Sequence, residues 1–491
     1  MPRVEEFQLH PTGWENDPDE EHFKLSTLDY LSAMTYNNYA LFFKVNDEHK
    51  SQVADILKKG LERTLSQTRH FVGTIEKNED GHHSIVKRKS STVKLVVQYL
   101  DSHEDVFPSF DDIEQAHFLS AKLGDINILS NAPMTYGEKT EAHPDNSPVV
   151  ASYKANFIPG GLILNMHSHH YSNDIVGWGN FVRQLADNCY AIFNNTALPS
   201  FDNKCLDRSR FMSPLVAEDA RTDAPPQADR HPEHKLSQCL IFHLPRSKAA
   251  QLKNAASPTD GSWISTYDAI SALTWRVFSR IRQPLYNPHP ASCPIWGEGV
   301  TMSKRLSNPI MPARMQGNQF FATLSTLSPI PQLTTAEIIS DAPLSKLASY
   351  TRQMTNGVTE DLLRGALQML APIRNKADLS VRVNSFPPMT VAMTDWRDAD
   401  VRFADFGFGK PGAFRHLLDT MAEGLVIVYP PHRGPAGEEE GIELQFAFEK
   451  ELVQQLVDDP EWNKYFEFRG VDAEEASSAH GVTESTQHLS K

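Results

Sequence analysis

The chain has 491 residues, 40% of them apolar and 22% charged, which is too long for one typical domain and sufficient for a sizeable core. Its formal net charge of −15 argues against non-specific binding to nucleic acid or to an anionic membrane. The four cysteines form no CxxC pair, and no apolar run resembles a signal peptide or could span a bilayer, so we expect a cytoplasmic protein with no membrane insertion.

The first half of the chain alternates between helix and strand patterns. Residues 53–65 carry apolar side chains at helical spacing, and the segment 78–86 is polar and typical of a turn. Residues 93–99 are rich in β-branched side chains and predict a strand. Residues 151–166 predict two strands that are broken at Pro159-Gly160-Gly161, which is a hairpin signal.

A helix is expected directly after this hairpin. Apolar residues from Ile175 to Cys189 recur on one helical face. Ser172 or Asn173 can cap the helix, which places Asp174 in its first turn, where negative charge is favoured.

The second half repeats the mixture of patterns. Ser265 begins a capping-box-like sequence, and apolar spacing over 270–281 predicts a helix behind it. The β-rich segments 424–429 and 442–448 flank a loop rich in glycine and glutamate, and they predict a second hairpin.

Composition suggests four segments. Residues 1–200 form the first predicted domain, and the polar, proline-bearing stretch 201–235 is the linker or crossover. Residues 236–472 form the second domain. The segment 473–491 is rich in Ser, Glu, Thr and His, and we expect it to be disordered.

The cluster His167-Ser-His169-His170 follows an apolar strand, and Asp174 lies four residues after the last histidine. An HxH pair at a strand end could bind zinc, although a catalytic zinc needs a third protein ligand. A histidine at a strand-to-helix turn could instead act as a general base near neutral pH. The third interpretation is a polar turn without chemistry, so this cluster needs a second signal.

That signal is Asp405-Phe-Gly-Phe-Gly409 near the C-terminus. Together, HxxxD at 170–174 and this segment resemble the BAHD acyltransferase family, which carries HxxxD near mid-chain and DFGWG near the C-terminus. Phe408 replaces the usual Trp of plant members, which brings the chain nearer to the fungal O-acetyltransferases of secondary metabolism. Further segments resemble the family in the same order: 25–29 (LSTLD), 57–75, 265–276, 303–306, Gly317-Asn318 and Thr394-Asp-Trp396.

The resemblance implies an α/β protein of two chloramphenicol-acetyltransferase-like domains, with mixed sheets, flanking helices and an active-site channel between the domains. It implies a monomer that transfers an acyl group, by default acetyl, from acyl-coenzyme A to a hydroxyl of a fungal terpenoid, alkaloid or polyketide. Acetyl-CoA would be a co-substrate, with no permanently bound cofactor and no metal. The sequence leaves the acceptor and the acyl chain length open.

The resemblance also implies roles at the reaction centre. His170 would be the general base, and Asp174 would fix the loop through an arginine rather than act in a triad. The indole N–H of Trp396, with Thr394 beside it, would donate to the oxyanion.

Other residues are expected to support the site. Asp405, with Gly407 and Gly409, would be structural, and Asp405 would pair with Arg305. Lys253 and Ser265 are the candidates for binding the phosphates of coenzyme A.

Two alternatives stay open at the level of sequence. One is a zinc-dependent hydrolase built on His167, His169 and His170. The other is a non-catalytic, condensation-like domain, because His169-His170 gives the first part of an HHxxxDG motif; Ile175 replaces its glycine.

Overall fold

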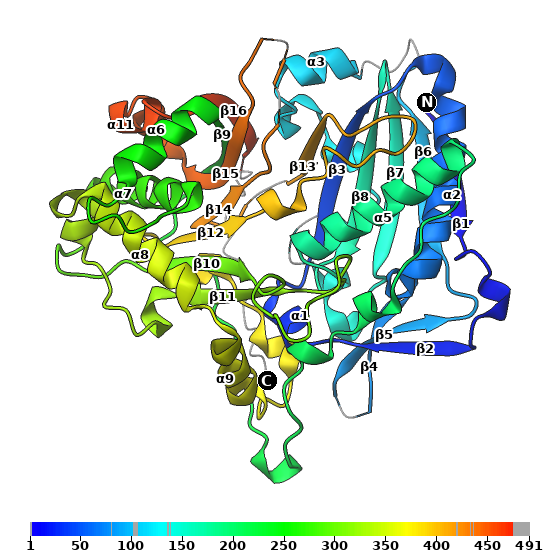
Figure 1. The fold of residues 1–491 in the computed structure, drawn as a ribbon, viewed down its shortest axis with the longest axis horizontal. Helices are drawn as coiled ribbons and strands as arrows, with labels where there is room; N and C mark the ends of the chain where they lie inside the picture. The colour runs from blue at the N-terminus through cyan, green and yellow to red at the C-terminus, as the bar shows by residue number, and fades with distance from the viewer. Residues whose placement is uncertain are drawn as a thin grey trace, which may run out of the picture.

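Two large sheets dominate the fold (Figure 1). The computed structural model describes residues 2–79, 81–101, 107–134, 137, 139–418, 421–432, 434–435 and 437–474. A third, three-stranded sheet has the order β2 (Glu20–Lys24), β5 (His83–Arg88) and β4 (Thr74–Lys77). Within the described residues, no helix is both long enough and apolar enough to cross a membrane.

The first large sheet is mixed and has six strands. Their order is β1 (Arg3–Leu9), β6 (Val93–Tyr99), β7 (Ala151–Ile158), β8 (Gly161–His169), β3 (Tyr36–Lys44) and β13 (Ala413–His416). The predicted strand at 93–99 and the predicted hairpin at Gly160 are therefore confirmed. Gly160 takes a φ of 70°, the left-handed conformation that lets the two strands fold back on each other.

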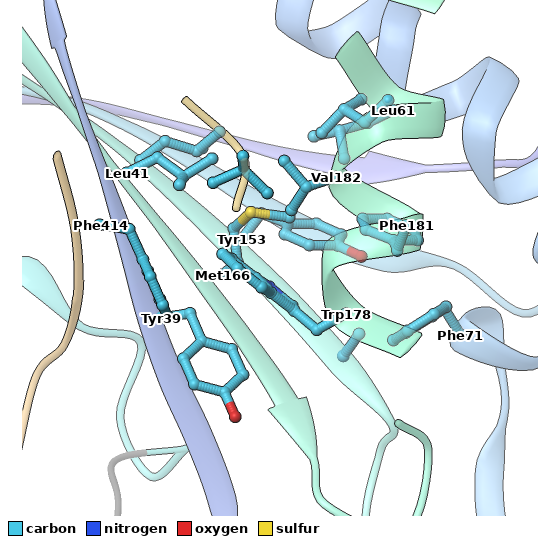
Figure 2. Close-up of a cluster of buried hydrophobic side chains, with 14 of the residues drawn as sticks. Tyr39, Leu41, Leu61, Phe71, Tyr153, Met166, Trp178, Phe181, Val182 and Phe414 are labelled. Atoms are coloured by element: carbon cyan, nitrogen blue, oxygen red, sulfur yellow. The ribbon is translucent and has the colours of Figure 1, made fainter. Parts of the chain in front are cut away.

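Helices α2 (Lys50–Gln67) and α5 (Ile175–Phe193) pack on one face of this sheet. Figure 2 shows Trp178, Phe181 and Val182 of α5 gathered over the sheet beside Tyr39 and Met166. The ring centroids of Trp178 and Tyr39 lie 4.7 Å apart. This apolar face supplies the burial that stabilises the first half of the molecule.

The second large sheet has seven strands and is also mixed. Their order is β11 (Phe320–Leu324), β10 (Trp296–Thr301), β12 (Val391–Asp395), β14 (Leu425–Val428), β15 (Gly441–Glu449), β9 (Ser237–Pro245) and β16 (Glu467–Glu474). Strands β14 and β15 pair antiparallel, as the sequence predicted, while β12 pairs parallel with both β10 and β14.

The main helices of the second half gather on one side of this sheet (Figure 1); they are α6 (Arg246–Ala256), α7 (Thr266–Tyr286) and α8 (Leu344–Gly357). Ser265 caps α7 in a capping box with Asp268, as predicted. The other helices are α1 (Thr27–Leu31), α3 (Phe110–Gln115), α4 (Ile126–Leu129), α9 (Glu360–Leu370), α10 (Val453–Val457) and α11 (Pro460–Asn463).

The second half of the chain contributes a strand to the first sheet. Strand β13 lies within the second predicted segment, yet it pairs with β3 and completes the first sheet. The segment 201–235 is more than a linker, because Cys205, Arg208 and Phe211 are buried in it. The domain boundaries at 200, 236 and 472 stay predictions. Strand β13 comes from the second predicted domain but belongs to the first sheet, so the sheets do not follow these boundaries.

Three local predictions need correction. The segment 78–86 contains a turn only as far as His82, because His83–Arg88 is strand β5, which pairs with β2 and β4 on either side. Helix α5 is capped by Asp174 itself, not by Ser172 or Asn173. At the C-terminal end, strand β16 reaches Glu474, and the rest of the predicted disordered tail, 475–491, lies outside the described residues.

The contact between α2 and α5 allows a stability test. A Cβ added to Gly60 would overlap the Sγ of Cys189 on α5. We expect Gly60→Ala to lower the thermal unfolding midpoint, because overpacking costs about 1–3 kcal/mol and exceeds the gain in helix propensity. Adding Cys189→Ala should restore much of the loss; equal midpoints for the single and double variants would contradict the contact.

Candidate active site

Three neighbouring strands of the first sheet carry polar residues at the same end. Strand β8 ends at His169, β3 begins at Tyr36, and β13 ends at His416. Because β3 is antiparallel to both neighbours, these three positions lie at the same end of the strands. His170 follows directly, and its backbone N–H donates to the carbonyl of Thr35 at 2.9 Å.

A cavity of about 510 Å³ opens at this end of the strands. Its walls come from both large sheets and from the crossover. Apolar side chains share the lining with many polar ones, including two arginines and three carboxylates. Its lining includes Asn37, His170, Thr394, Trp396 and His416. A cavity of this size, in which polar groups are set among apolar side chains, is typical of a small-molecule site.

His170 lies in the cavity wall. Burial lowers the pKa of the His170 imidazole below its ordinary value, while its own carbonyl, the Asn318 side chain and the charge of Asp29 partly oppose this shift. The ring is therefore neutral at pH 7 and can accept a proton.

Asp29 holds the loop that carries His170. One carboxylate oxygen of Asp29 accepts from the backbone N–H and the side-chain amide of Asn318, at 3.1 and 2.9 Å. The same Asn318 Nδ2 donates to the carbonyl oxygen of His170 at 2.9 Å. Asp29 is fully buried, so this chain of hydrogen bonds connects α1 to the backbone of His170 without intervening solvent.

Arg208 completes the same network from the crossover. Its Nη1 lies 3.0 Å from the second oxygen of Asp29, and its Nη2 donates to the carbonyl of Ser172 at 2.8 Å. Nη1 also donates to the carbonyl of Tyr171 at 3.3 Å. An arginine therefore fixes the turn, as the sequence suggested, but it acts on the backbone and on Asp29.

Asp174 has a different environment from the predicted one. Its two carboxylate oxygens accept from the backbone N–H groups of Gly177 and Gln319, at 2.8 and 2.6 Å. The predicted ion pair between Asp174 and an arginine is therefore wrong. Burial raises the pKa of Asp174 to about 6, although the amide donors oppose the shift.

The other two histidines are occupied by backbone groups. His169 Nε2 hydrogen-bonds the carbonyl of Ala142, and its Nδ1 accepts from the N–H of Tyr171. His167 Nε2 accepts from the N–H of Asn131 at 3.3 Å. Both rings are buried, which lowers their pKa values to about 4 and about 3. This arrangement does not support a zinc site on the cluster, and the described part of the chain brings together no other set of three His, Cys, Asp or Glu side chains suited to a metal.

Thr394 and Trp396 both line the cavity. The indole N–H of Trp396 donates to Thr394 Oγ1 at 3.2 Å. The predicted oxyanion donor is therefore already engaged by its neighbour. The hydroxyl hydrogen of Thr394 keeps its rotational freedom toward the cavity.

The contacts of the DFGFG segment are packing and backbone contacts, as in a structural motif. Gly407 takes a φ of 84°, and a Cβ there would lie 2.6 Å from Phe193. Phe406 packs on Phe43, which lies about 20 Å along β3 from Asn37. Gly409, with a φ of 158°, accepts from the N–H of Phe406. No residue of the segment lines the cavity, which agrees with a structural role.

The predicted ion pair of this segment is wrong. Asp405 accepts from the N–H of Gly407 at 2.9 Å and lies 3.9 Å from Lys410. Arg305 instead donates to the carbonyl of Val358 at 2.8 Å, and burial lowers its pKa.

The two candidates for coenzyme A are outside the cavity lining. Lys253 places its ammonium 5.4 Å from the ring centroid of Trp263, and Ser265 is engaged in the cap of α7. Their role in binding coenzyme A stays a prediction.

Sequence reasoning missed three contributors: Asn37, Arg208 and His416. Arg208 lies in a segment without periodicity, where no pattern marks a buried residue. Asn37 and His416 sit at strand ends 379 positions apart, and they meet only through the pairing of β3 with β13.

The ion pair between Asp29 and Arg208 can be tested directly. We expect Arg208→Met to lower both the thermal midpoint and the turnover, because removing one partner of a buried pair costs about 3–5 kcal/mol and releases the His170 turn. The matched control is Arg210→Met, two residues along, whose side chain is 22% exposed. Equal losses in both variants would contradict the assignment.

Comparison with known proteins agrees with this architecture. The Transferase family model matches residues 15–463. Acetyltransferase FGR3 of Gibberella zeae is 53% identical over 474 residues, covering 96% of this chain and 95% of that protein. Trichothecene 3-O-acetyltransferase TRI101 of Fusarium sporotrichioides is 26% identical over 462 residues, covering 89% and 94%.

Solved structures share the fold. The crystal structure of F. graminearum TRI101 complexed with ethyl coenzyme A superimposes with a TM-score of 0.75 at 22% identity, covering 92% of this chain and 100% of that one. Vinorine synthase superimposes with a TM-score of 0.64 at 18% identity, covering 92% and 96%. The two-sheet fold, the family match over most of the length and the 53% identical relative together show that this chain belongs to the BAHD family of acyltransferases.

Proposed function

We propose that this enzyme is an O-acetyltransferase that moves the acetyl group of acetyl-CoA to a hydroxyl of a fungal secondary metabolite. The observation that carries the proposal is a neutral, rigidly held His170 in a cavity between the two sheets. The names of its relatives support acetyl transfer, and the TRI101 structures with coenzyme A support a CoA thioester as donor.

The chemistry requires one base. His170 takes the proton of the acceptor hydroxyl while the oxygen attacks the thioester carbonyl. A C–O bond forms and the carbonyl oxygen becomes negative. The intermediate then collapses, the C–S bond breaks, and His170 returns the proton to the CoA thiolate. No covalent enzyme intermediate is needed, because the thioester is already activated.

The cavity suits a neutral acceptor. Apolar side chains such as Leu418 and Met421 line it, and the charge of Arg230 at its wall is paired with Glu423. An acceptor with a compact apolar skeleton and one reactive hydroxyl fits this lining, because apolar contacts give affinity and polar groups fix orientation.

The activity test measures the thiol released from acetyl-CoA with a panel of hydroxylated terpenoids, alkaloids and polyketides. We expect thiol release above background with at least one alcohol. The product should be about 42 mass units heavier than that alcohol, because one acetyl group replaces one hydrogen. Release of acetate without any acetylated product across the panel would instead favour a hydrolase.

His170 provides the mechanistic test. We expect His170→Ala to lower turnover by roughly 10²–10⁴-fold, the usual contribution of a positioned base, while binding of coenzyme A is retained. The control is His22→Ala, a histidine whose side chain is 55% exposed on strand β2. Turnover within a few-fold of the parent enzyme in His170→Ala would rule out the base.

The pH profile follows from the lowered pKa of His170. The active form is the neutral ring, so activity is lost as the pH falls through that pKa and is constant above it. We expect the acidic midpoint of kcat/KM to lie below pH 6.5, the ordinary pKa of histidine. A midpoint above 6.5 would contradict the assignment.

A further inference from the structure

One buried hydrogen-bond donor in the cavity wall has no partner. Asn37 is 3% exposed and lines the cavity, and its Nδ2 has no hydrogen-bond partner among the residues that the structure describes. Leaving such a donor unpaired costs about 1–3 kcal/mol, so an unpaired amide at a reaction site suggests a ligand atom as its partner.

The amide lies beside the base. Asn37 pairs with Ser168 across β3 and β8, and the carbonyl of Thr35, two residues earlier on the chain, accepts from the N–H of His170. The Asn37 side chain therefore belongs to the reaction centre and not to a distant wall of the cavity.

His416 fixes the orientation of this amide. His416 Nε2 donates to Asn37 Oδ1 at 3.3 Å, since an amide oxygen can only accept. The His416 ring is 2% exposed and packs edge-on against Tyr39, with centroids 4.8 Å apart. Burial and the nearby His170 and His167 lower the pKa of His416 to about 3, so the ring stays neutral and does not compete as a base.

One oxygen of the reaction needs a hydrogen-bond donor. The attacking hydroxyl gives its proton to His170, and the sulfur leaves as a thiolate. The thioester oxygen gains the negative charge, and Trp396 N–H is already bound to Thr394. An unpaired N–H donor in the same cavity wall as His170 is suited to the thioester oxygen, the atom that most needs a hydrogen bond in the transition state.

We infer that the Asn37 amide donates to the oxyanion during acyl transfer and that His416 is its positioning residue. This inference rests on the proposed function. As the alcohol oxygen bonds to the carbonyl carbon, the C=O π electrons move to the oxygen, which Nδ2 stabilises; their return expels the CoA thiolate. Asn37 exchanges no proton in either step.

The experiment uses the full-length enzyme with acetyl-CoA and the best alcohol from the panel above. We expect Asn37→Leu and Asn37→Asp each to lower kcat by roughly 10²–10³-fold, as for loss of an oxyanion-hole donor, with the KM for the alcohol and the Kd for coenzyme A within about threefold of the parent. Thr394→Val is measured alongside, because its hydroxyl is the rival donor.

His416 is tested with His416→Phe, which keeps a ring against Tyr39 but removes the donor to Asn37. We expect a smaller fall in kcat, and no further fall when His416→Phe is combined with Asn37→Leu, because both variants act on one hydrogen bond. Additive losses in the double variant would contradict the positioning role of His416.

The matched control is Asn38→Leu. Asn38 is the next residue of β3, and its amide is bonded to Ser130 and Asn165 on the other face of the sheet. We expect a lower thermal midpoint but a kcat within about threefold of the parent. Thermal midpoints of all the variants separate misfolding from catalytic loss.

Two results would overturn the inference while the proposed function stands: an active parent with unchanged kcat in both Asn37 variants, or a loss that appears in the KM for the alcohol and not in kcat. A parent that releases no thiol with any alcohol would instead count against the proposed function itself.

Discussion

The buried carboxylate of Asp29 is the point on which the reaction site depends. Taking one charge into an apolar interior costs several kcal/mol unless it is paired and hydrogen-bonded. Here Arg208 supplies the opposite charge, and Ser26 and Asn318 supply N–H donors. Because these partners come from different segments of the chain, the segments must come together for the charge to be buried at all.

The same network sets the position of His170, the proposed base. Asn318 and Arg208 donate to three consecutive carbonyls, those of His170, Tyr171 and Ser172. Asp174 then caps α5 and accepts from Gln319, so the turn is held on both sides. The carboxylate of the HxxxD motif thus shapes the backbone, while a different carboxylate carries the ion pair.

Sequence patterns correctly predicted those elements whose formation depends on residues close together in the chain. Apolar spacing placed α2 and α5, Gly160 marked the β7–β8 hairpin, and Ser265 marked the start of α7. The pattern failed for β5, whose polar residues are buried by two neighbouring strands that the sequence does not place beside it. It also failed for Arg305, because the nearest carboxylate in space cannot be inferred from motif order.

The sequence by itself determined the family and the α/β character and made His170 the candidate base, because ordered motifs and hydrophobic periodicity are properties of short segments. The tertiary structure decided which charges pair and which donors stay unpaired. Asn37 meets His416 only because β13 crosses back to the first sheet, and Asp29 meets Arg208 only because the crossover packs against α1. Such contacts depend on long-range pairing, whose energy no single segment contains.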